Sequence, residues 1–331
     1  MSDHDESDNL STGTADTGAR PGSALGAAPD LLLLAMDHRS SLQKQVYGID
    51  GEPTPAQIEQ ISAGKTLVFE GLLEAVNRGV DPSTVGVLVD ERYGTAVASK
   101  AKAAGIDLAM PIEKSGHDFF VLEYGDFTTT EWLSHVETFD PAQVKVLVRD
   151  NPAFDAAERA AQMAHLAAVG DVLREAGRVF LIELLIPATP AQLASVDQDA
   201  LRYDRDVRPS LTTQVISELQ HAHVEPQIWK IEGLETREAA ESIVAAARQD
   251  GRASVTCIVL GRDAPAERLD HWLSVAAPVD GFRGFAIGRS IWEQPLADHL
   301  AGLTGPHDLV DRVATNFTHF AAVYAAAATA G

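Results

Sequence analysis

The sequence predicts a single (β/α)8 (TIM) barrel because eight short apolar runs alternate with helical stretches. Alternating strands and helices predict a parallel sheet with right-handed crossovers, and eight such units in about 300 residues fit a closed barrel. A doubly wound open sheet is the alternative. The barrel is favoured because no dinucleotide fingerprint follows the first run. The runs are Leu31–Met36, Val85–Val89, Leu108–Ile112, Val144–Val148, Val179–Leu185, Ile228–Ile231, Val255–Leu260 and Phe282–Ile287.

The helical stretches between the runs carry apolar residues on one side, and several begin with Pro, Ser, Thr or Asp, as helix starts do. In the first of them, Ile58, Ile61 and Leu72 lie on one side. Helices of this kind cover the outer face of a parallel barrel. The clearest stretches are Pro55–Arg78, Phe154–Ala176, Pro209–His221, Glu235–Gln249 and Asp308–Ala328.

The composition divides the chain into a tail and one domain. Residues 1–28 are rich in Ser, Gly, Ala, Thr and Asp and have almost no large apolar side chains, so we expect a disordered acidic tail. Residues 29–331 form the predicted barrel domain, since no later change in composition marks a second boundary.

The net charge of -22 argues against binding to nucleic acid or to an anionic membrane surface. No run is long enough to cross a bilayer, and the acidic N-terminus lacks the pattern of a signal peptide, so a cytoplasmic protein is expected. The one cysteine, Cys257, excludes an intramolecular disulfide and is interpreted as a small core residue. Barrels of this size often self-associate, and the sequence leaves a homo-oligomer open.

Cations stand at or just after the C-terminal ends of most of the predicted strands. In a strongly acidic chain, cations gathered at one mouth of a barrel predict a site for an anionic small molecule. They are Arg39, Arg92, Lys114, Arg149, Arg262 and Arg289.

Three charged residues lie inside adjacent strands: Lys145, Glu183 and Lys230. Side chains alternate between the interior and the helix layer of a barrel, so these three become neighbours if their faces point inward. A buried ion-pair network that only holds the barrel together is the alternative. Charges on three successive strands favour function, because buried charges are costly unless they are paired or used.

A buried lysine near a second cation is suited to imine formation, since burial and like charge both lower the pKa of the amine. Lys230 is the preferred nucleophile because its neighbours in the strand are apolar, and Lys145 is the second candidate. Glu183 is placed to move protons during carbinolamine formation and dehydration.

Gly-Arg pairs follow the last two strands, at Gly261–Arg262 and Gly288–Arg289. Glycine lets the backbone approach a ligand and arginine offers a charged fork, so the pairs predict a phosphate site where barrel enzymes commonly hold one. An ordinary turn is the alternative for each pair.

Two aspartates end the first and second strands, namely Asp37 and Asp90. Both are candidates to bind substrate hydroxyls or to act as acid or base. For Asp90, helix capping or pairing with Arg92 is an equal alternative. Arg39 and Arg149 are further candidate substrate-binding residues at the same mouth.

No metal or other cofactor is expected. His221 and His223 have the spacing of metal ligands, but they precede the sixth strand and so belong to the opposite mouth of the barrel. His38 and His117 lie at the correct mouth and form no ligand set with a third histidine.

Taken together, long ordered strings of the sequence resemble one family, the aldolase domain fused to the sugar kinase of bacterial inositol breakdown. That domain is assigned as 5-dehydro-2-deoxyphosphogluconate aldolase. More distantly, the chain is similar to tagatose-bisphosphate aldolases, which are class I (β/α)8 enzymes. The resemblance runs from about residue 30 to the C-terminus and rests on AMDHRSSL, VLVDERYG, PIEKSGHDFF, VKVLVRDNP, ELLIPAT, YDRDVRPSL, VEPQIWKIEG, CIVLGRD and GFAIGRSIW.

The resemblance implies a class I aldolase with Lys230 as the Schiff-base lysine, Glu183 as acid/base and Lys145 as the supporting amine. It also implies that Asp37 lies near the substrate and that a phosphate binds near Gly288 and Arg289. The expected substrate is 5-dehydro-2-deoxy-D-gluconate 6-phosphate, cleaved to dihydroxyacetone phosphate and malonate semialdehyde. A tagatose-bisphosphate or sulfosugar-phosphate aldolase is the nearest alternative, and a non-catalytic phosphosugar-binding protein is the alternative from another class.

Overall fold

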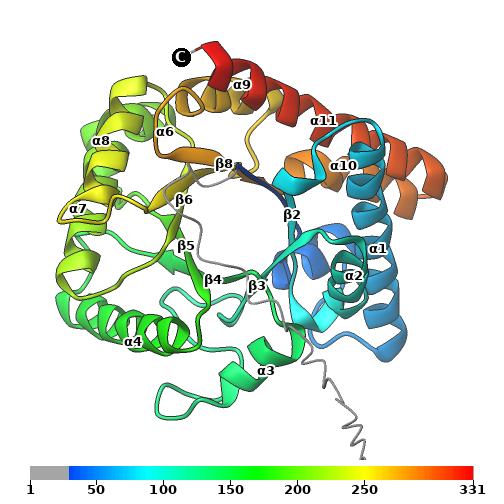
Figure 1. Ribbon diagram of the computed structural model, residues 1–331, viewed down its shortest axis with the longest axis horizontal. Helices are drawn as coiled ribbons and strands as arrows, with labels where there is room; N and C mark the ends of the chain where they lie inside the picture. Colours follow the sequence, from blue (N-terminus) through cyan, green and yellow to red (C-terminus); the bar gives the residue numbers. More distant parts are fainter. Residues whose placement is uncertain (1–29, 331) are drawn as a thin grey trace, which may run out of the picture.

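The computed structural model describes residues 30–330, and in it eight parallel strands close into a barrel in the order β1 to β8. Figure 1 shows the strands at the centre of the molecule and the helices in a ring around them. The prediction of a (β/α)8 barrel is therefore confirmed. The tail predicted for residues 1–28 lies outside the described residues.

Every strand pairs in parallel with its neighbours in the sequence, and β1 closes the ring by pairing with β8. The observed bounds agree with the predicted runs to within one or two residues, because each run is apolar enough to be buried on both of its faces. The strands are β1 (Leu31–Ala35), β2 (Val85–Leu88), β3 (Asp107–Pro111), β4 (Gln143–Arg149), β5 (Val179–Leu185), β6 (Ile228–Glu232), β7 (Thr256–Leu260) and β8 (Phe282–Ile287).

Several helices begin at conventional capping residues. Thr54 and Gln57 form a capping box at the start of α1, with Pro55 in the first turn. The α-helices are α1 (Pro55–Asn77), α2 (Glu91–Ala104), α3 (Glu131–Phe139), α4 (Ala156–Glu175), α5 (Pro190–Ser195), α6 (Ala200–Arg202), α7 (Arg208–His221), α8 (Arg237–Arg248), α9 (Ala266–Ala276), α10 (Arg289–Leu300) and α11 (Pro306–Ala330). Shorter helical turns are η1 (Leu42–Val46), η2 (Pro82–Thr84) and η3 (Tyr203–Val207).

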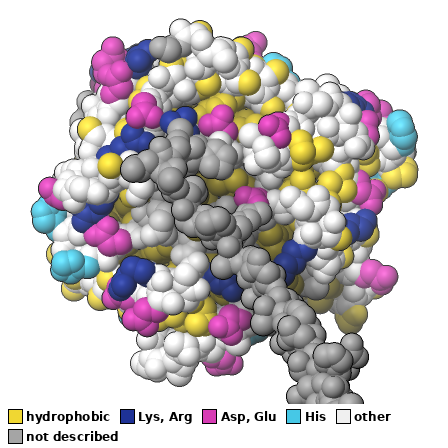
Figure 2. Space-filling model, in the orientation of Figure 1, with side chains coloured by type: hydrophobic (Ala, Val, Ile, Leu, Met, Phe, Trp, Pro, Cys, Tyr) yellow, Lys and Arg dark blue, Asp and Glu magenta, His cyan; other side chains and the backbone are white. Residues whose placement is uncertain are grey.

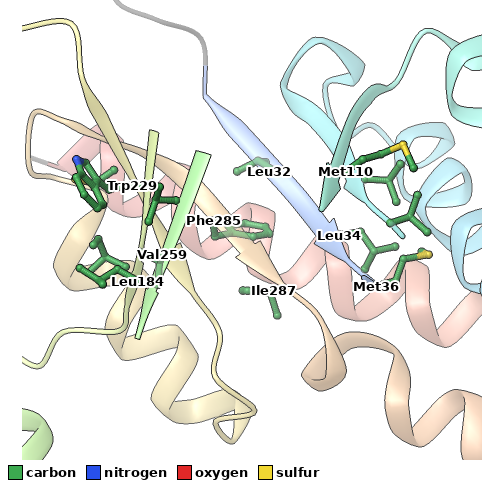
Figure 3. Packing of buried hydrophobic residues seen from close by; sticks show 14 of the residues in the cluster. Leu32, Leu34, Met36, Met110, Leu184, Trp229, Val259, Phe285 and Ile287 are labelled. Carbon is green, nitrogen blue, oxygen red and sulfur yellow. The ribbon is translucent and has the colours of Figure 1, made fainter. Parts of the chain in front are cut away.

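Alternate strand residues belong to two separate apolar clusters. One cluster fills the space between the strands and the helices, and Figure 3 shows Leu32 and Leu34 of β1 beside Phe285 and Ile287 of β8 in it. Burying a large apolar side chain contributes about 1.5–3 kcal/mol, so this layer carries much of the stability. The smaller cluster fills the barrel interior with Leu31, Leu33, Ala35, Leu88, Ala109, Leu181, Ile258 and Ala286.

The outer surface of the barrel mixes charges of both signs. On the face shown in Figure 2, lysine and arginine side chains are interspersed with aspartate and glutamate. Cys257 is buried, and burial raises the pKa of its thiol to about 12, which agrees with a core role. Among residues 30–330, none of the helices combines the length and the hydropathy that crossing a bilayer requires.

Candidate functional site

The inward-facing positions of the strands become charged toward the C-terminal mouth of the barrel. In β1, Leu31, Leu33 and Ala35 point inward, and Asp37 continues this alternation just after the strand. In β5, Leu181 belongs to the interior cluster and Glu183 comes two residues later. The inward-facing positions, which recur every two residues, are therefore apolar inside the barrel and charged near its C-terminal mouth.

The structure brings Lys145, Glu183 and Lys230 into direct contact. Both lysine ammonium groups lie against the same carboxylate oxygen of Glu183, with Nζ to Oε2 distances of 2.9 Å for Lys145 and 3.0 Å for Lys230. Each lysine is only 2 % exposed. Strand register explains the second contact, because Glu183 of β5 is the pairing partner of Lys230 of β6.

Lys145 contacts two more carboxylates. Its Nζ donates to Asp37 Oδ2 at 2.8 Å and to Glu113 Oε1 at 2.9 Å. Burial alone would lower the pKa of Lys145, but attraction to Asp37, Glu113 and Glu183 outweighs burial and raises that pKa well above its usual value. Lys145 is therefore a fixed cation. Lys230, by contrast, has Glu183 as its one ion-pair partner among the described residues.

Lys145, the second cation expected beside Lys230, is itself surrounded by carboxylates. Three carboxylates surround Lys145, so the two ammonium groups face more negative than positive charge within contact distance. Sequence reasoning counted the lysines in the strands and missed Glu113, which follows β3 and lies inward by the same two-residue period as Ala109 and Pro111.

The carboxylates of Asp37 and Glu183 are ionised at neutral pH. Burial alone would raise both pKa values, but the positive charges of Lys145 and Lys230 outweigh it and lower the pKa of each carboxyl. Lys145 neutralises the carboxylates that converge on it. Within residues 30–330, no group of three or more His, Cys, Asp or Glu side chains is arranged to hold a metal ion.

The cluster forms the wall of a cavity of about 330 Å³ at the C-terminal mouth, a volume suited to a small molecule. The loops after β1, β3, β7 and β8 form its rim. Of the predicted site residues, those that line it are Asp37, Arg39, Lys145, Arg149, Glu183, Lys230, Gly261, Arg262, Gly288 and Arg289.

The two Gly-Arg pairs lie together on the β7–β8 side of the cavity. Gly288 is the N-cap of α10, so the backbone N–H groups of the first turn of this helix begin at the cavity wall. A side chain at position 288 is excluded, because a Cβ atom there would lie 2.5 Å from the carbonyl oxygen of Ala35. Glycine at position 288 thus allows the backbone segments of β1 and α10 to lie close together, and it leaves the backbone open to a phosphate.

Both arginines of these pairs already contact carboxylates. Arg262 lies 2.8 Å from Asp204 Oδ1 and 3.0 Å from Glu232 Oε1. Arg289 forms an ion pair with Asp263. An anionic ligand on this side meets arginines that are partly neutralised by the protein itself.

Arg39 and Arg149 lie on the other side of the cavity. The Arg39 guanidinium forms an ion pair with Glu123 at 3.0 Å and donates a hydrogen bond to the carbonyl oxygen of Glu113 at 2.6 Å. Arg149 donates to the carbonyl oxygen of His117 at 3.0 Å.

The assignment of Asp90 to substrate is corrected, and its alternative role as a helix cap is observed. The strand before it ends at Leu88, and the chain turns directly into α2, so Asp90 becomes the N-cap and accepts a hydrogen bond from the backbone of Tyr93 at 2.9 Å. Its charge partner is Lys65 of α1, and Asp90 is fully buried and does not line the cavity. The Arg92 guanidinium pairs instead with Glu52 at the surface.

Nothing in the sequence indicated the role of Lys65, and sequence reasoning placed His38 at this mouth of the barrel without assigning it a role. Lys65 Nζ donates to the carbonyl oxygens of Met36 at 2.6 Å and His38 at 3.1 Å, so it holds the backbone on both sides of Asp37. His38 lines the cavity, and its ring contacts the edge of Trp292. Burial lowers the pKa of His38 to about 4, which keeps this imidazole neutral at pH 7.

Known proteins resemble the chain in part of the sequence and in the whole fold. Tagatose 1,6-diphosphate aldolase 2 of Enterococcus faecalis (strain ATCC 700802 / V583) is 34 % identical over 85 residues, which are 26 % of this chain. That match spans only 22 % of the relative's own length. The structure of fructose-bisphosphate aldolase from Plasmodium falciparum, in complex with TRAP and a small molecule inhibitor, superposes with a TM-score of 0.57 at 12 % identity.

The superposition covers 90 % of this chain and 91 % of the Plasmodium falciparum enzyme, and at that identity it shows a shared barrel fold. A family model matches almost the whole chain, over residues 20–328. The chain therefore belongs to the family described as uncharacterized protein conserved in bacteria (DUF2090).

Proposed function

We propose that this protein is a class I aldolase in which Lys230 forms an imine with the ketone of a phosphorylated keto sugar or keto sugar acid. The observation that carries the proposal is the contact between the buried Lys230 ammonium and Glu183 at the wall of the cavity. The partial sequence match to a tagatose 1,6-diphosphate aldolase supports the same reaction class.

The geometry favours Lys230 over Lys145 as the nucleophile. Lys145 is held by three carboxylates, and its raised pKa opposes the loss of a proton that attack on a carbonyl requires. Within residues 30–330, Lys230 has a single carboxylate partner, Glu183, which lies 3.0 Å away and can accept its proton. Lys145 then supplies a fixed positive charge that stabilises the ionised carboxylates around it.

In the proposed reaction, Glu183 moves the protons of imine formation. Glu183 accepts the proton of the Lys230 ammonium, and the free amine adds to the ketone carbon. The excess proton on the nitrogen moves to the alkoxide oxygen to form the carbinolamine, and Glu183 then protonates the carbinolamine hydroxyl, which leaves as water and gives the iminium. The iminium withdraws the electron pair of the C–C bond, while a carboxylate accepts the proton of the hydroxyl whose carbon becomes the aldehyde. Protonation of the enamine and addition of water release the second product and free Lys230.

The phosphate of the substrate is assigned to the β7–β8 side of the cavity. Gly261 and Gly288 allow close approach of the backbone there, and the N-terminus of α10 favours an anion. With the phosphate at this side and the imine at Lys230, the reaction yields dihydroxyacetone phosphate from a substrate phosphorylated next to its ketone. The proposed substrate is 5-dehydro-2-deoxy-D-gluconate 6-phosphate, and malonate semialdehyde is then the second product.

The test is borohydride reduction in the presence of dihydroxyacetone phosphate, followed by peptide mapping. The expected result is an adduct on Lys230 that is absent in Lys230→Arg, while Lys145→Arg retains it on Lys230. An adduct on a different residue would overturn the assignment, and absence of any adduct together with phosphate binding would favour a non-catalytic phosphosugar-binding protein. Turnover of tagatose bisphosphate or a sulfosugar phosphate, compared with the inositol-pathway substrate, separates the aldolase alternatives.

A further inference from the structure

His38 lines the cavity of the candidate site, and the proposed reaction gives it no role. Its ring nitrogen Nδ1 is enclosed by the protein and has no hydrogen-bond partner within residues 30–330. Enclosed polar atoms without a partner are rare in folded proteins, so each of them requires an explanation. Nε2 is the other ring nitrogen and is therefore the one that can meet a ligand in the cavity.

The imidazole lies beside the proposed phosphate site. A Cβ atom at Gly288 would lie 3.1 Å from His38 Cε1, so the ring packs against the N-cap of α10. The ring also contacts Trp292 of α10 at its edge, with 5.6 Å between the ring centroids. Lys65 holds the backbone in place by donating to the carbonyl oxygen of His38 at 3.1 Å. The imidazole is therefore fixed where the backbone N–H groups of α10 begin.

The surroundings of His38 keep the imidazole neutral. Burial lowers the pKa of His38 to about 4, and the positive charges of Arg289 and Lys230 act in the same direction. The carboxylates of Asp37 and Glu183 oppose this effect without reversing it. The enclosed Nδ1 adds a geometric reason, because a proton on it would have no acceptor within the described part of the chain. We therefore assign the one proton of the neutral ring to Nε2, which makes Nε2 a hydrogen-bond donor.

A neutral donor differs from the two arginines beside it. Arg262 and Arg289 are paired with carboxylates of the protein, so a ligand must compete for their N–H groups. An uncharged imidazole forms no ion pair with Asp37, the carboxylate next to it in the sequence, and Asp37 instead accepts a hydrogen bond from Lys145 at 2.8 Å. The Nε2–H group of His38 thus stays available to a ligand.

We infer that His38 is a substrate-binding residue that donates a hydrogen bond from Nε2 to a phosphate held near Gly288 and Arg289. The inference rests on the proposed function for the position of the phosphate, and it adds a donor from the loop after β1 to the β7–β8 side of the cavity. The ligand group is a phosphate monoester or another tetrahedral dianion, since its several oxygens can meet a helix N-terminus, a guanidinium and an imidazole together. The alternative is an imidazole that only packs against Trp292.

Two variants separate the hydrogen-bond donor from the ring. In His38→Gln the side-chain amide can donate from nearly the position of Nε2, whereas His38→Phe keeps a flat ring against Trp292 and has no donor. Calorimetric titration with sodium sulfate, which is a dianion across the neutral range, should give wild-type protein and His38→Gln affinities within about threefold of each other. Sulfate should bind His38→Phe about tenfold more weakly, the usual effect of losing a hydrogen bond to a charged group. Equal affinities of wild-type protein and His38→Phe, or an equal loss in both variants, would overturn the inference.

Two further variants show whether the titration reports the proposed site. Arg289→Gln removes the neighbouring guanidinium and is expected to weaken sulfate binding. His319→Phe, at an exposed histidine of α11 that pairs with Asp270, is the matched control and leaves the affinity unchanged. Unchanged binding in Arg289→Gln would place the anion elsewhere and would overturn the inference as well.

The wild-type protein alone offers a test of the neutral ring. Sulfate binding at pH 6 should take up little proton, about 0.2 per site or less, when calorimetry compares two buffers of different ionisation enthalpy. Asp37 and Glu183 contribute no proton, because the positive charges of Lys145 and Lys230 outweigh burial and keep both carboxyl pKa values low. A larger uptake that disappears in His38→Gln would show that the ring binds the anion as a cation, which would overturn the inference.

These binding measurements require no imine, so their outcome is distinguishable from that of the proposed function. Equal sulfate affinities of wild-type protein and His38→Phe would overturn the role of His38 even if borohydride trapping at Lys230 succeeds. The expected loss in His38→Phe without any trapping would support the donor at the anion site and reject the aldolase.

Discussion

Asp263 and Arg289 form an ion pair in the wall between two neighbouring cavities. Both residues line the cavity of the candidate site and also a second cavity of about 530 Å³ beside α10 and α11. The loop that presents Asp263 has positive φ angles at two successive non-glycine residues, 44° at Arg262 and 52° at Asp263. Such backbone is unfavourable unless its surroundings hold it, so the ion pair helps to define the loop.

The contact between Asp263 and Arg289 places a carboxylate where the phosphate of a substrate would compete for the guanidinium. We expect Asp263→Asn to tighten binding of inorganic phosphate about three- to tenfold, because Arg289 loses its internal counter-charge. Calorimetric titration at low ionic strength measures the change. Asp270→Asn on α9, where Asp270 pairs with His319, is the matched control and leaves the affinity unchanged. Weaker binding in Asp263→Asn would mean that Asp263 orients Arg289 instead of competing for it.

Lys145 is expected to be the most important charge for stability. Lys145→Met leaves Asp37, Glu113 and Glu183 buried without their shared cation, and breaking a buried network in this way costs about 3–5 kcal/mol. Urea denaturation followed by circular dichroism gives the free energy of unfolding. The exposed pair of Lys100 with Glu70 is the control, since Lys100→Met should change stability by less than about 1 kcal/mol. A similarly small loss for Lys145→Met would show that the carboxylates find other partners.

His38 makes the stability of the protein depend on pH below neutrality. Its pKa falls from 6.5 to about 4 on folding, so between these two values the unfolded chain binds a proton that the folded chain does not. Stability therefore falls as the pH decreases through this range, by about 3 kcal/mol in total. Denaturant unfolding at pH 7 and pH 4.5 should show a smaller difference for His38→Gln than for the wild type. The same acid dependence in both proteins would assign it to other groups.

Gly288 tests the close approach of backbone at the proposed phosphate site. The Cβ atom of Gly288→Ala would lie 2.5 Å from Ala35 O and 3.1 Å from the His38 ring, so β1 or α10 must shift. Overpacking of this kind costs about 1–3 kcal/mol, and the shift should also weaken phosphate binding. Thermal unfolding and phosphate titration measure the two effects. Gly305→Ala is the control, because a Cβ atom there has no neighbour within 4 Å; equal behaviour of the two variants would contradict the role of Gly288.

The strands and the lysine–glutamate contacts were predictable because both follow from a period of two. Leu181 and Glu183 share a face of β5 by simple alternation, and Lys230 is then brought opposite Glu183 by strand register. The alternation of side chains predicts orientation only within a strand. Asp90 comes two residues after Leu88 of β2, so simple alternation would turn it inward. The chain has already turned into α2 at this point, and the side chain of Asp90 caps that helix.

Contacts made from outside the strands could not be read from the sequence. Lys65 reaches the mouth of the barrel from the middle of α1, and no local pattern distinguishes it from a surface lysine of a helix. The partners of Arg262 and Arg289 come from loops whose conformation depends on tertiary packing. The sequence therefore located the cations and left open which of them the protein neutralises.

The pairing of Glu183 with Lys230 across β5 and β6 limits which parts of the sequence can accept insertions and deletions. Inserting or deleting one residue in either strand would turn its acidic or basic group toward the helices and break the contact between the two side chains. The loops after β3 and β7 carry no such constraint, since they add groups at the rim without altering the hydrogen-bonding ladder. Exchange of those loops between related chains would thus change the rim of the cavity while the contact between Glu183 and Lys230 stays the same.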